Sequence, residues 1–237
     1  MNIFVILMLL SIIPSIILGL IVYNNDRVEK EPLKMIAGLF VGGISVVAFV
    51  LCINLVMESY LPFFSKDVEK LSDIELFISM LFGVALIEEG GKWLIFKKLA
   101  WNNKEFNYLY DAIVYSVFIS LGFATVENML YVLDGGLWVA IIRSICSVPG
   151  HVFFAIYMGY YFGLAKQAQI NNKKKLKNNK LIKSLLIPTL LHTFFNYFLF
   201  SNNKCVMLMY VLFIILLYIK SFKRIKTLGS ISVEMKN

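Results

Sequence analysis

Charged residues and cysteines are scarce in this chain of 237 residues. Only 16% of the residues are charged and 59% are hydrophobic, which excludes an ordinary soluble globular domain. The three cysteines, Cys52, Cys146 and Cys205, show no CxxC spacing, so they predict neither a disulfide framework nor a zinc ribbon. The HExxH motif of zinc proteases and the GxSxG motif of serine hydrolases are also absent. The composition therefore predicts a membrane protein, and the missing motifs count against these two hydrolase classes.

Long apolar runs dominate what the sequence does contain. A helix of about 20 apolar residues crosses the hydrocarbon core of a bilayer, which is about 30 Å thick. Seven stretches are of this kind: 2–23, 35–57, 76–96, 112–133, 137–164, 181–200 and 205–219. Because backbone groups in lipid must be hydrogen-bonded internally, we expect an all-α, polytopic membrane bundle of about seven transmembrane helices. We expect one integral-membrane domain over 1–237. The fifth stretch is long enough to tilt or kink, and Pro149-Gly150 lies at its centre.

Lysine and arginine are distributed unevenly between the loops. The regions after the first, third, fifth and last apolar stretches hold 18 positive residues, whereas the intervening loops hold only Lys66, Lys70 and Lys204. The positive-inside rule then predicts that the N-terminus lies outside and the C-terminus in the cytoplasm. The run Lys173–Lys183 is expected to form a flexible cytoplasmic loop near anionic lipid headgroups. No aromatic interleaving accompanies this run, so we expect no nucleic-acid partner.

Polar side chains nevertheless occur inside the apolar stretches, and a carboxylate near the middle of a spanning helix costs about 2.5–3.5 kcal/mol or more. The helical rise of about 1.5 Å per residue predicts their depths. Near the midplane we expect Glu88, Glu89, His151 and His192, with Lys92 one turn beyond the glutamates. Nearer the extracytoplasmic face we expect Glu127, Arg143 and Asn196. Such residues are functional-site candidates by default.

Small residues share helical faces with these ionisable ones. Ser120 lies on the face of Glu127, and Ser147 and Gly159 lie on the face of His151. Small residues let membrane helices approach closely. We therefore expect these faces to pack against each other rather than against lipid.

Two chemistries suit this set of side chains. A carboxylate base with two imidazoles can activate water and protonate a leaving amine. Glutamate and histidine can also ligate zinc, whose catalytic sites use three protein ligands and a water. The absence of HExxH weakens the zinc alternative without excluding it.

Four motifs follow one another on successive predicted helices. They are EExxK at Glu88-Glu89-Gly90-Gly91-Lys92, FxxxE at Phe123–Glu127 continuing to Tyr131, a single His151, and HxxxN at His192–Asn196. In this order, over roughly 76–200, they resemble the PrsW family of bacterial intramembrane proteases. The wider CPBP group, which includes the CaaX prenyl endopeptidases, typically shows EExxxR and FxxxH instead, so Lys92 and Glu127 favour PrsW. Asn196 departs from the pattern, because PrsW sequences often have aspartate there.

The resemblance implies an endopeptidase in the bacterial plasma membrane that makes the first cut in a single-span anti-sigma factor. That cut leads to release of an extracytoplasmic-function sigma factor under envelope or antimicrobial-peptide stress. We expect metal-independent hydrolysis without a cofactor, and zinc is the alternative.

In this mechanism the catalytic residues are Glu88, Glu89, His151 and His192, and the supporting ones are Lys92, Glu127, Arg143 and Asn196. Glu88 or Glu89 activates the water, the two histidines stabilise the oxyanion and move protons, and Asn196 orients His192.

Two other functions remain as alternatives. One is a CaaX-type or CPBP endopeptidase with another peptide substrate. The other is a small proton-coupled transporter, since intramembrane carboxylates and histidines also build ion pathways. A transporter predicts a polar path to both faces and often inverted repeats, and the sequence shows neither.

Overall fold

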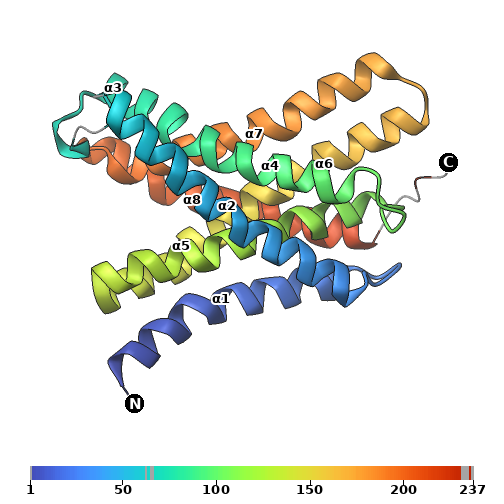
Figure 1. The fold of residues 1–237 in the computed structure, drawn as a ribbon, viewed down its shortest axis with the longest axis horizontal. Helices are drawn as coiled ribbons and strands as arrows, with labels where there is room; N and C mark the ends of the chain where they lie inside the picture. The colour runs from blue at the N-terminus through green and yellow to red at the C-terminus, as the bar shows by residue number, and fades with distance from the viewer. Residues whose placement is uncertain (1, 62, 65–66, 231–234, 236–237) are drawn as a thin grey trace.

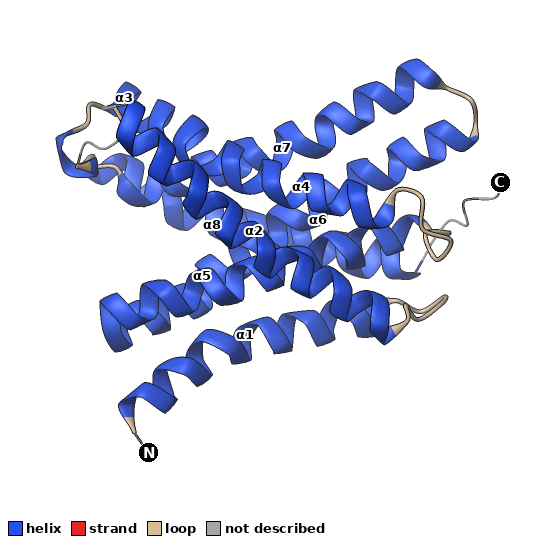
Figure 2. Cartoon of the chain, in the orientation of Figure 1, coloured by secondary structure: helices blue, strands red, loops and turns tan. Residues whose placement is uncertain are grey.

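The chain folds into a bundle of long helices, and the computed structural model describes residues 2–61, 63–64, 67–230 and 235. Within these residues there is no strand (Figure 2), so the all-α prediction is confirmed. The α-helices are α1 (Ile3–Asn25), α2 (Leu33–Tyr60), α3 (Asp73–Ile78), α4 (Leu86–Ala100), α5 (Leu109–Ile145), α6 (Ser147–Ile170), α7 (Lys174–Phe200) and α8 (Lys204–Ser230). A short 3₁₀ turn, η1 (Val68–Lys70), precedes α3, and a π-helical segment, η2 (Ser79–Ala85), joins α3 to α4.

Several of these helices have the length and apolar composition of membrane spans. Four stretches of the described chain qualify: Ile3–Asn25, Leu33–Tyr60, Leu109–Ile170 and Lys204–Gly229. Large apolar side chains face outward along α1, α2 and α8, as helices in contact with lipid require. The expected spans at 76–96 and 181–200 are not among the four, and they are the ones that carry the EExxK and HxxxN motifs. The chain is a membrane protein, and the number of crossings stays a prediction.

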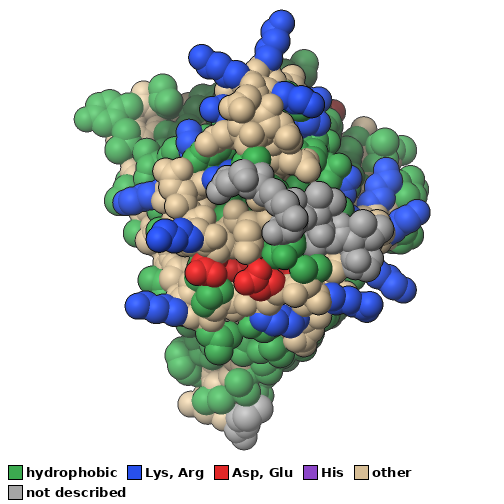
Figure 3. Space-filling view, turned by 90° about the vertical axis from the view of Figure 1, so that its right-hand side faces the viewer, with side chains coloured by type: hydrophobic (Ala, Val, Ile, Leu, Met, Phe, Trp, Pro, Cys, Tyr) green, Lys and Arg blue, Asp and Glu red, His purple; other side chains and the backbone are tan. Residues whose placement is uncertain are grey.

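The two ends of the bundle differ in charge. The loops after α1, α4 and α6 and the C-terminal end lie together at one end of the molecule, and the N-terminus lies at the other (Figure 1). Figure 3 faces the first of these ends and shows lysine and arginine side chains projecting all around it. This grouping supports the charge rule used to predict orientation.

The chain reverses direction inside α5. Gly136 has φ 71° and ψ −159°, a left-handed conformation that glycine adopts without strain. On a straight helix the 16 positions between Glu127 and Arg143 would separate them by about 24 Å, yet their side chains form an ion pair. The α5 segment after Gly136 therefore folds back along the segment before it.

The fifth apolar stretch is interrupted within one turn of Pro149-Gly150. The interruption lies at Cys146, and Pro149 lies in the first turn of α6. Proline is tolerated there because a first-turn N–H has no intrahelical acceptor.

The expected flexible loop at Lys173–Lys183 is wrong. The turn is confined to the residues between α6 and α7, with Asn172 at φ 56°, and α7 begins at Lys174. Lysine is a good helix former, so α7 extends through the basic run.

Helix α5 is the centre of the bundle and packs against α1, α2 and α6. As predicted, its small-residue face meets that of α6: the Ser120 hydroxyl donates to the backbone oxygen of His151 at 3.0 Å. Its contact with α2 is also close, since a Cβ on Gly43 would overlap the backbone oxygen of Ile119, and one on Gly122 would overlap that of Phe40. The backbones of α2 and α5 are therefore in direct contact, and no flexible side chain lies between them that could move to make room for a Cβ.

Replacing Gly43 by alanine is therefore expected to separate α2 from α5 and to destabilise the protein by about 1–3 kcal/mol or more. Gly38→Ala on the same helix is the matched control, because a Cβ there meets no atom within 4 Å. It should be neutral or slightly stabilising, since alanine favours helix. Thermal unfolding in detergent measures both, and equal midpoints for the two variants would contradict the close α2–α5 contact.

Candidate active site

The first part of the site comes from α4, which begins directly after the π-helical segment η2. Such segments are often found at functional sites. The side chains of Glu88, Glu89 and Lys92 all point into the protein, with residue exposures of 5%, 0% and 1%. The i, i+3 and i, i+4 spacing predicted from sequence thus places both glutamates beside one lysine.

The Lys92 ammonium lies at the centre of the site and contacts three of its polar side chains. Its Nζ lies 2.8 Å from Glu89 Oε1, 3.4 Å from Glu88 Oε2 and 3.2 Å from His151 Nδ1. It also lies 3.9 Å from the centre of the Phe123 ring, a cation–π contact. The three N–H donors of the ammonium therefore each have a partner. Phe123, a motif residue given no role from sequence, forms part of the site.

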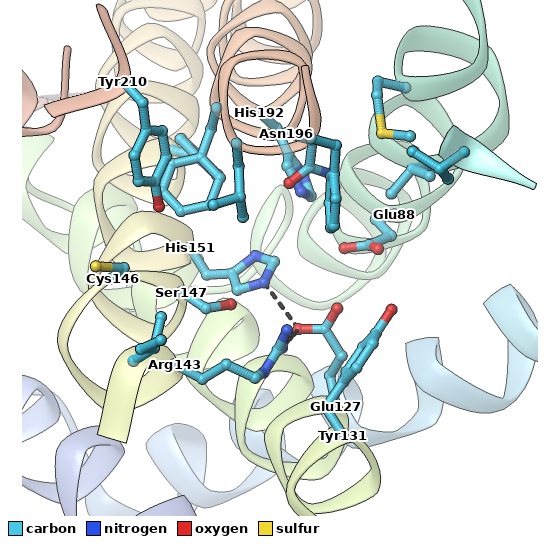
Figure 4. Close-up of a pocket in the computed structure, with 18 residues that line it drawn as sticks. Glu88, Glu127, Tyr131, Arg143, Cys146, Ser147, His151, His192, Asn196 and Tyr210 are labelled. Atoms are coloured by element: carbon cyan, nitrogen blue, oxygen red, sulfur yellow. Dashed lines mark hydrogen bonds and ion pairs between the residues drawn. The ribbon is translucent and has the colours of Figure 1, made fainter. Parts of the chain in front are cut away.

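His151 lies between Lys92 and a second ion pair, formed by Glu127 and Arg143. Because an ammonium can only donate, Nδ1 of His151 is the acceptor from Lys92. The proton of the neutral ring is then on Nε2, which lies 3.0 Å from Glu127 Oε2. The same carboxylate oxygen accepts from Arg143 Nη2 at 2.7 Å (Figure 4). Glu127 and Arg143 are thus in direct contact with the central cluster rather than in a separate outer layer.

Arg143 is held on three sides. Besides Glu127, its Nε donates to Asn128 Oδ1 at 3.0 Å, and its guanidinium lies 4.1 Å from the centre of the Tyr131 ring. These contacts depend on the reversal at Gly136, which brings the last turns of α5 back to Glu127.

His192 contacts the cluster from α7. Its Nδ1 lies 3.2 Å from Glu89 Oε1, so the carboxylate accepts and Nε2 is left as the basic nitrogen. The ring stacks on Phe154 with a centroid distance of 4.9 Å and an interplanar angle of 20°. Phe154 was not singled out from sequence, and its only signal is its position one turn after His151. Asn196 lines a cavity together with His192 (Figure 4). The hydrogen bond of His192 Nδ1 goes to Glu89, so the expected role of Asn196 in orienting His192 stays a prediction.

Two cavities meet at this cluster. The first, of about 240 Å³, is lined by Glu88, His151 and His192 together with residues of α5, α7 and α8. The second, of about 300 Å³, lies between α2 and α5. Glu88, Glu127 and Tyr131 line both cavities, whereas Glu89 lines neither of them. The two adjacent glutamates therefore differ: Glu88 faces both cavities, and Glu89 is enclosed by its ion pairs.

The same side chains can hold a metal ion. Glu88, Glu89, His151 and His192 each offer one ligand atom, and all four atoms lie within 4.8 Å of one another. Glu89 Oε2 is buried without a hydrogen-bond partner. Mixed nitrogen and oxygen ligands of this kind suit zinc. In this structure the positive charge beside Glu88, Glu89 and His151 is the ammonium of Lys92.

Comparisons with known proteins agree with the motifs. The family described as "PrsW family intramembrane metalloprotease" matches residues 31–220. Protease PrsW of Oceanobacillus iheyensis is 34% identical over 216 residues, which cover 91% of this chain and 93% of that protein. Protease PrsW of Clostridioides difficile is 35% identical over 216 residues, covering 90% and 87%. Protease PrsW of Bacillus subtilis is 30% identical over 225 residues, covering 94% and 97%.

No solved structure matches this chain significantly. The family match spans most of the chain, and the relatives align over nearly their whole length. The chain therefore belongs to the PrsW family of intramembrane proteases and is a peptidase.

Proposed function

We propose that this protein is a multi-pass peptidase of the bacterial plasma membrane that cleaves a single-span membrane substrate with a water activated by Glu88. The main support for this proposal is the position of Glu88. Its side chain faces both cavities and also contacts the ammonium of Lys92. A general base must lie within hydrogen-bonding reach of the water that it deprotonates. Of the two adjacent glutamates, only Glu88 lines space for such a water.

The two cavities supply a path for the substrate. One lies between α2 and α5, the other is bounded by α5, α6, α7 and α8, and they share Glu88, Glu127 and Tyr131. A transmembrane helix must unwind locally before its peptide bonds can be attacked, because helical carbonyls are already hydrogen-bonded. An unwound segment passing from one cavity to the other would lie across the site. Glu127 and Arg143 are on the side predicted to be extracytoplasmic, so we propose that the cut lies in the outer part of the substrate span.

Roles in the hydrolysis of a peptide bond can then be assigned to the polar side chains of the site. As the water attacks the substrate carbonyl, its proton moves to the Glu88 carboxylate, which later gives this proton to the leaving amine. The second proton of the water is proposed to pass to the basic Nε2 of His192, which lines the same cavity as Glu88 and whose other nitrogen is fixed by Glu89. Arg143 lines the same cavity and has five N–H groups, of which two bond to Glu127 and Asn128. The remaining donors suit the developing oxyanion.

The family description includes a metal, and the four-residue donor set fits one. A zinc ion held by Glu88, Glu89, His151 and His192 would supply a water of lowered pKa and polarise the carbonyl. We propose metal-independent hydrolysis instead, because Lys92 Nζ lies 2.8–3.4 Å from three of these four residues and already places a positive charge between the two carboxylates.

Proteolysis by the purified protein, with and without a strong chelator, tests this mechanism. The substrate is a single-span anti-sigma factor from the same cell, the substrate class that we propose. We expect cleavage at an unchanged rate in chelator. Loss of cleavage that added zinc restores would make the protein a zinc peptidase, and absence of cleavage of every single-span substrate would contradict the proposed function.

The proposed orientation has the N-terminus outside and the C-terminus in the cytoplasm, with seven crossings. The grouping of the basic loops at one end of the bundle supports it.

A further inference from the structure

A second cluster of buried carboxylates lies away from the active site, at the end of the molecule where the loop between α1 and α2 meets the start of α5. Its members are Asp26, Glu31 and Asp111, whose exposures are 2%, 3% and 0%. One oxygen of each lies within 4.8 Å of the others. Figure 3 faces this end and shows other, exposed acidic side chains on its surface, whereas the three cluster members are buried beneath the surface.

Part of this cluster is fixed by hydrogen bonds. The Tyr115 hydroxyl donates to Glu31 Oε2 at 2.6 Å. The backbone N–H groups of Asn107 and Tyr108 donate to Asp111 Oδ2 at 3.0 and 2.6 Å. These bonds fix the carboxylates of Glu31 and Asp111, which also lie within hydrogen-bonding distance of each other, and none of the three donors carries a positive charge.

Two oxygens of the cluster have no partner. Asp111 Oδ1 and Asp26 Oδ2 are buried and accept no hydrogen bond. Leaving a buried polar atom unsatisfied costs about 1–3 kcal/mol, and more for a charged group. Two such atoms on neighbouring side chains indicate a ligand that bonds to both.

Among the residues that the structure describes, little positive charge lies near the three carboxylates. Lys30 attracts Asp26, but its ammonium is exposed and donates to the backbone oxygen of Tyr23 at 2.6 Å. Burial therefore still raises the pKa of Asp26, and it raises the pKa of Glu31 to about 7. The missing partner should be a cation.

We propose that Asp26, Glu31 and Asp111 form a binding site for a hard divalent cation of the magnesium or calcium class, which joins the α1–α2 loop to the first turn of α5. The ligand atoms are all carboxylate oxygens, the type that these ions prefer over nitrogen and sulfur ligands. The site is independent of the peptidase site, which has a mixed donor set and its own cation in Lys92.

Manganese binding to the purified, metal-stripped full chain tests this proposal, with bound and free Mn²⁺ distinguished by electron paramagnetic resonance. We expect Asp111→Asn and Glu31→Gln each to weaken Mn²⁺ binding at this site at least tenfold. Both replacements keep the acceptor oxygens used by the backbone and by Tyr115. Mg²⁺ or Ca²⁺ should compete with Mn²⁺ and raise the thermal midpoint of the wild type, but not that of Asp111→Asn.

Two controls isolate the site. Glu29→Gln changes an exposed carboxylate of the same loop and should leave Mn²⁺ binding intact. Glu88→Gln, in the peptidase site, should also leave this binding event intact, which separates it from any metal bound there. Failure of the wild type to bind Mn²⁺ at millimolar concentration would overturn the proposal in favour of shared protons. Unchanged binding in both cluster variants would overturn it as well.

Discussion

Glu88→Gln is expected to abolish substrate cleavage while leaving the protein folded. General-base catalysis contributes about 10²- to 10⁴-fold, and an amide cannot take the proton of the water. Stability should change little, because glutamine still offers an oxygen to Lys92, whose contact with Glu88 is the longer one at 3.4 Å. The measurements are the cleavage rate of a single-span substrate and the thermal midpoint in detergent.

Glu89→Gln should behave differently. Glu89 is fully enclosed and pairs with both Lys92 and His192, so its loss should lower the thermal midpoint as well as activity. Glu58→Gln on α2 is the matched control for a glutamate-to-glutamine change, since Glu58 is exposed and outside the site. An active Glu88→Gln protein beside an inactive but stable Glu89→Gln protein would reverse the two roles.

The second large effect is expected for Lys92→Met. Methionine fills a similar volume but leaves Glu88 and Glu89 buried without their cation, and removing one partner of a buried ion pair costs about 3–5 kcal/mol. For a chain of this size the thermal midpoint should fall by about 6–20 °C. Cleavage should be lost too, because Nδ1 of His151 loses its donor and the ring keeps a hydrogen bond on one side, to Glu127, rather than on both.

A double variant shows whether charge is the cause. Adding Glu89→Gln to Lys92→Met removes one uncompensated carboxylate and should restore part of the lost stability. Lys98→Met, in the last turn of α4 and exposed, is the control for the side-chain change and should have little effect. A small effect of Lys92→Met would mean that another cation neutralises the glutamates, which would favour the zinc mechanism.

What the sequence determined by itself rests on local physics. Apolar runs long enough to cross a bilayer predicted the all-α fold, because no other backbone arrangement within such a run satisfies its own hydrogen bonds. The contacts of Glu88 and Glu89 with Lys92 followed from helical periodicity alone. The motifs identified the family, and the comparisons confirm it.

Tertiary structure alone decided which side chains work together across helices. His151 lies between Lys92 and Glu127 only because α4, α5 and α6 pack in one arrangement. Arg143 reaches Glu127 only because the chain reverses at Gly136, whose φ is positive.

The acidic cluster shows the same limit. Asp26 and Glu31 come from a loop and Asp111 from a helix about 80 positions further along the chain, where sequence spacing carries no information on distance. Hydropathy and helical periodicity describe only the helix to which a residue belongs. Contacts between residues far apart in the sequence depend on how whole helices pack, on a single positive φ and on loop lengths. For that reason candidate residues for the active site could be named from the sequence, but the proposed division of roles between Glu88 and Glu89 required the cavities that packing creates.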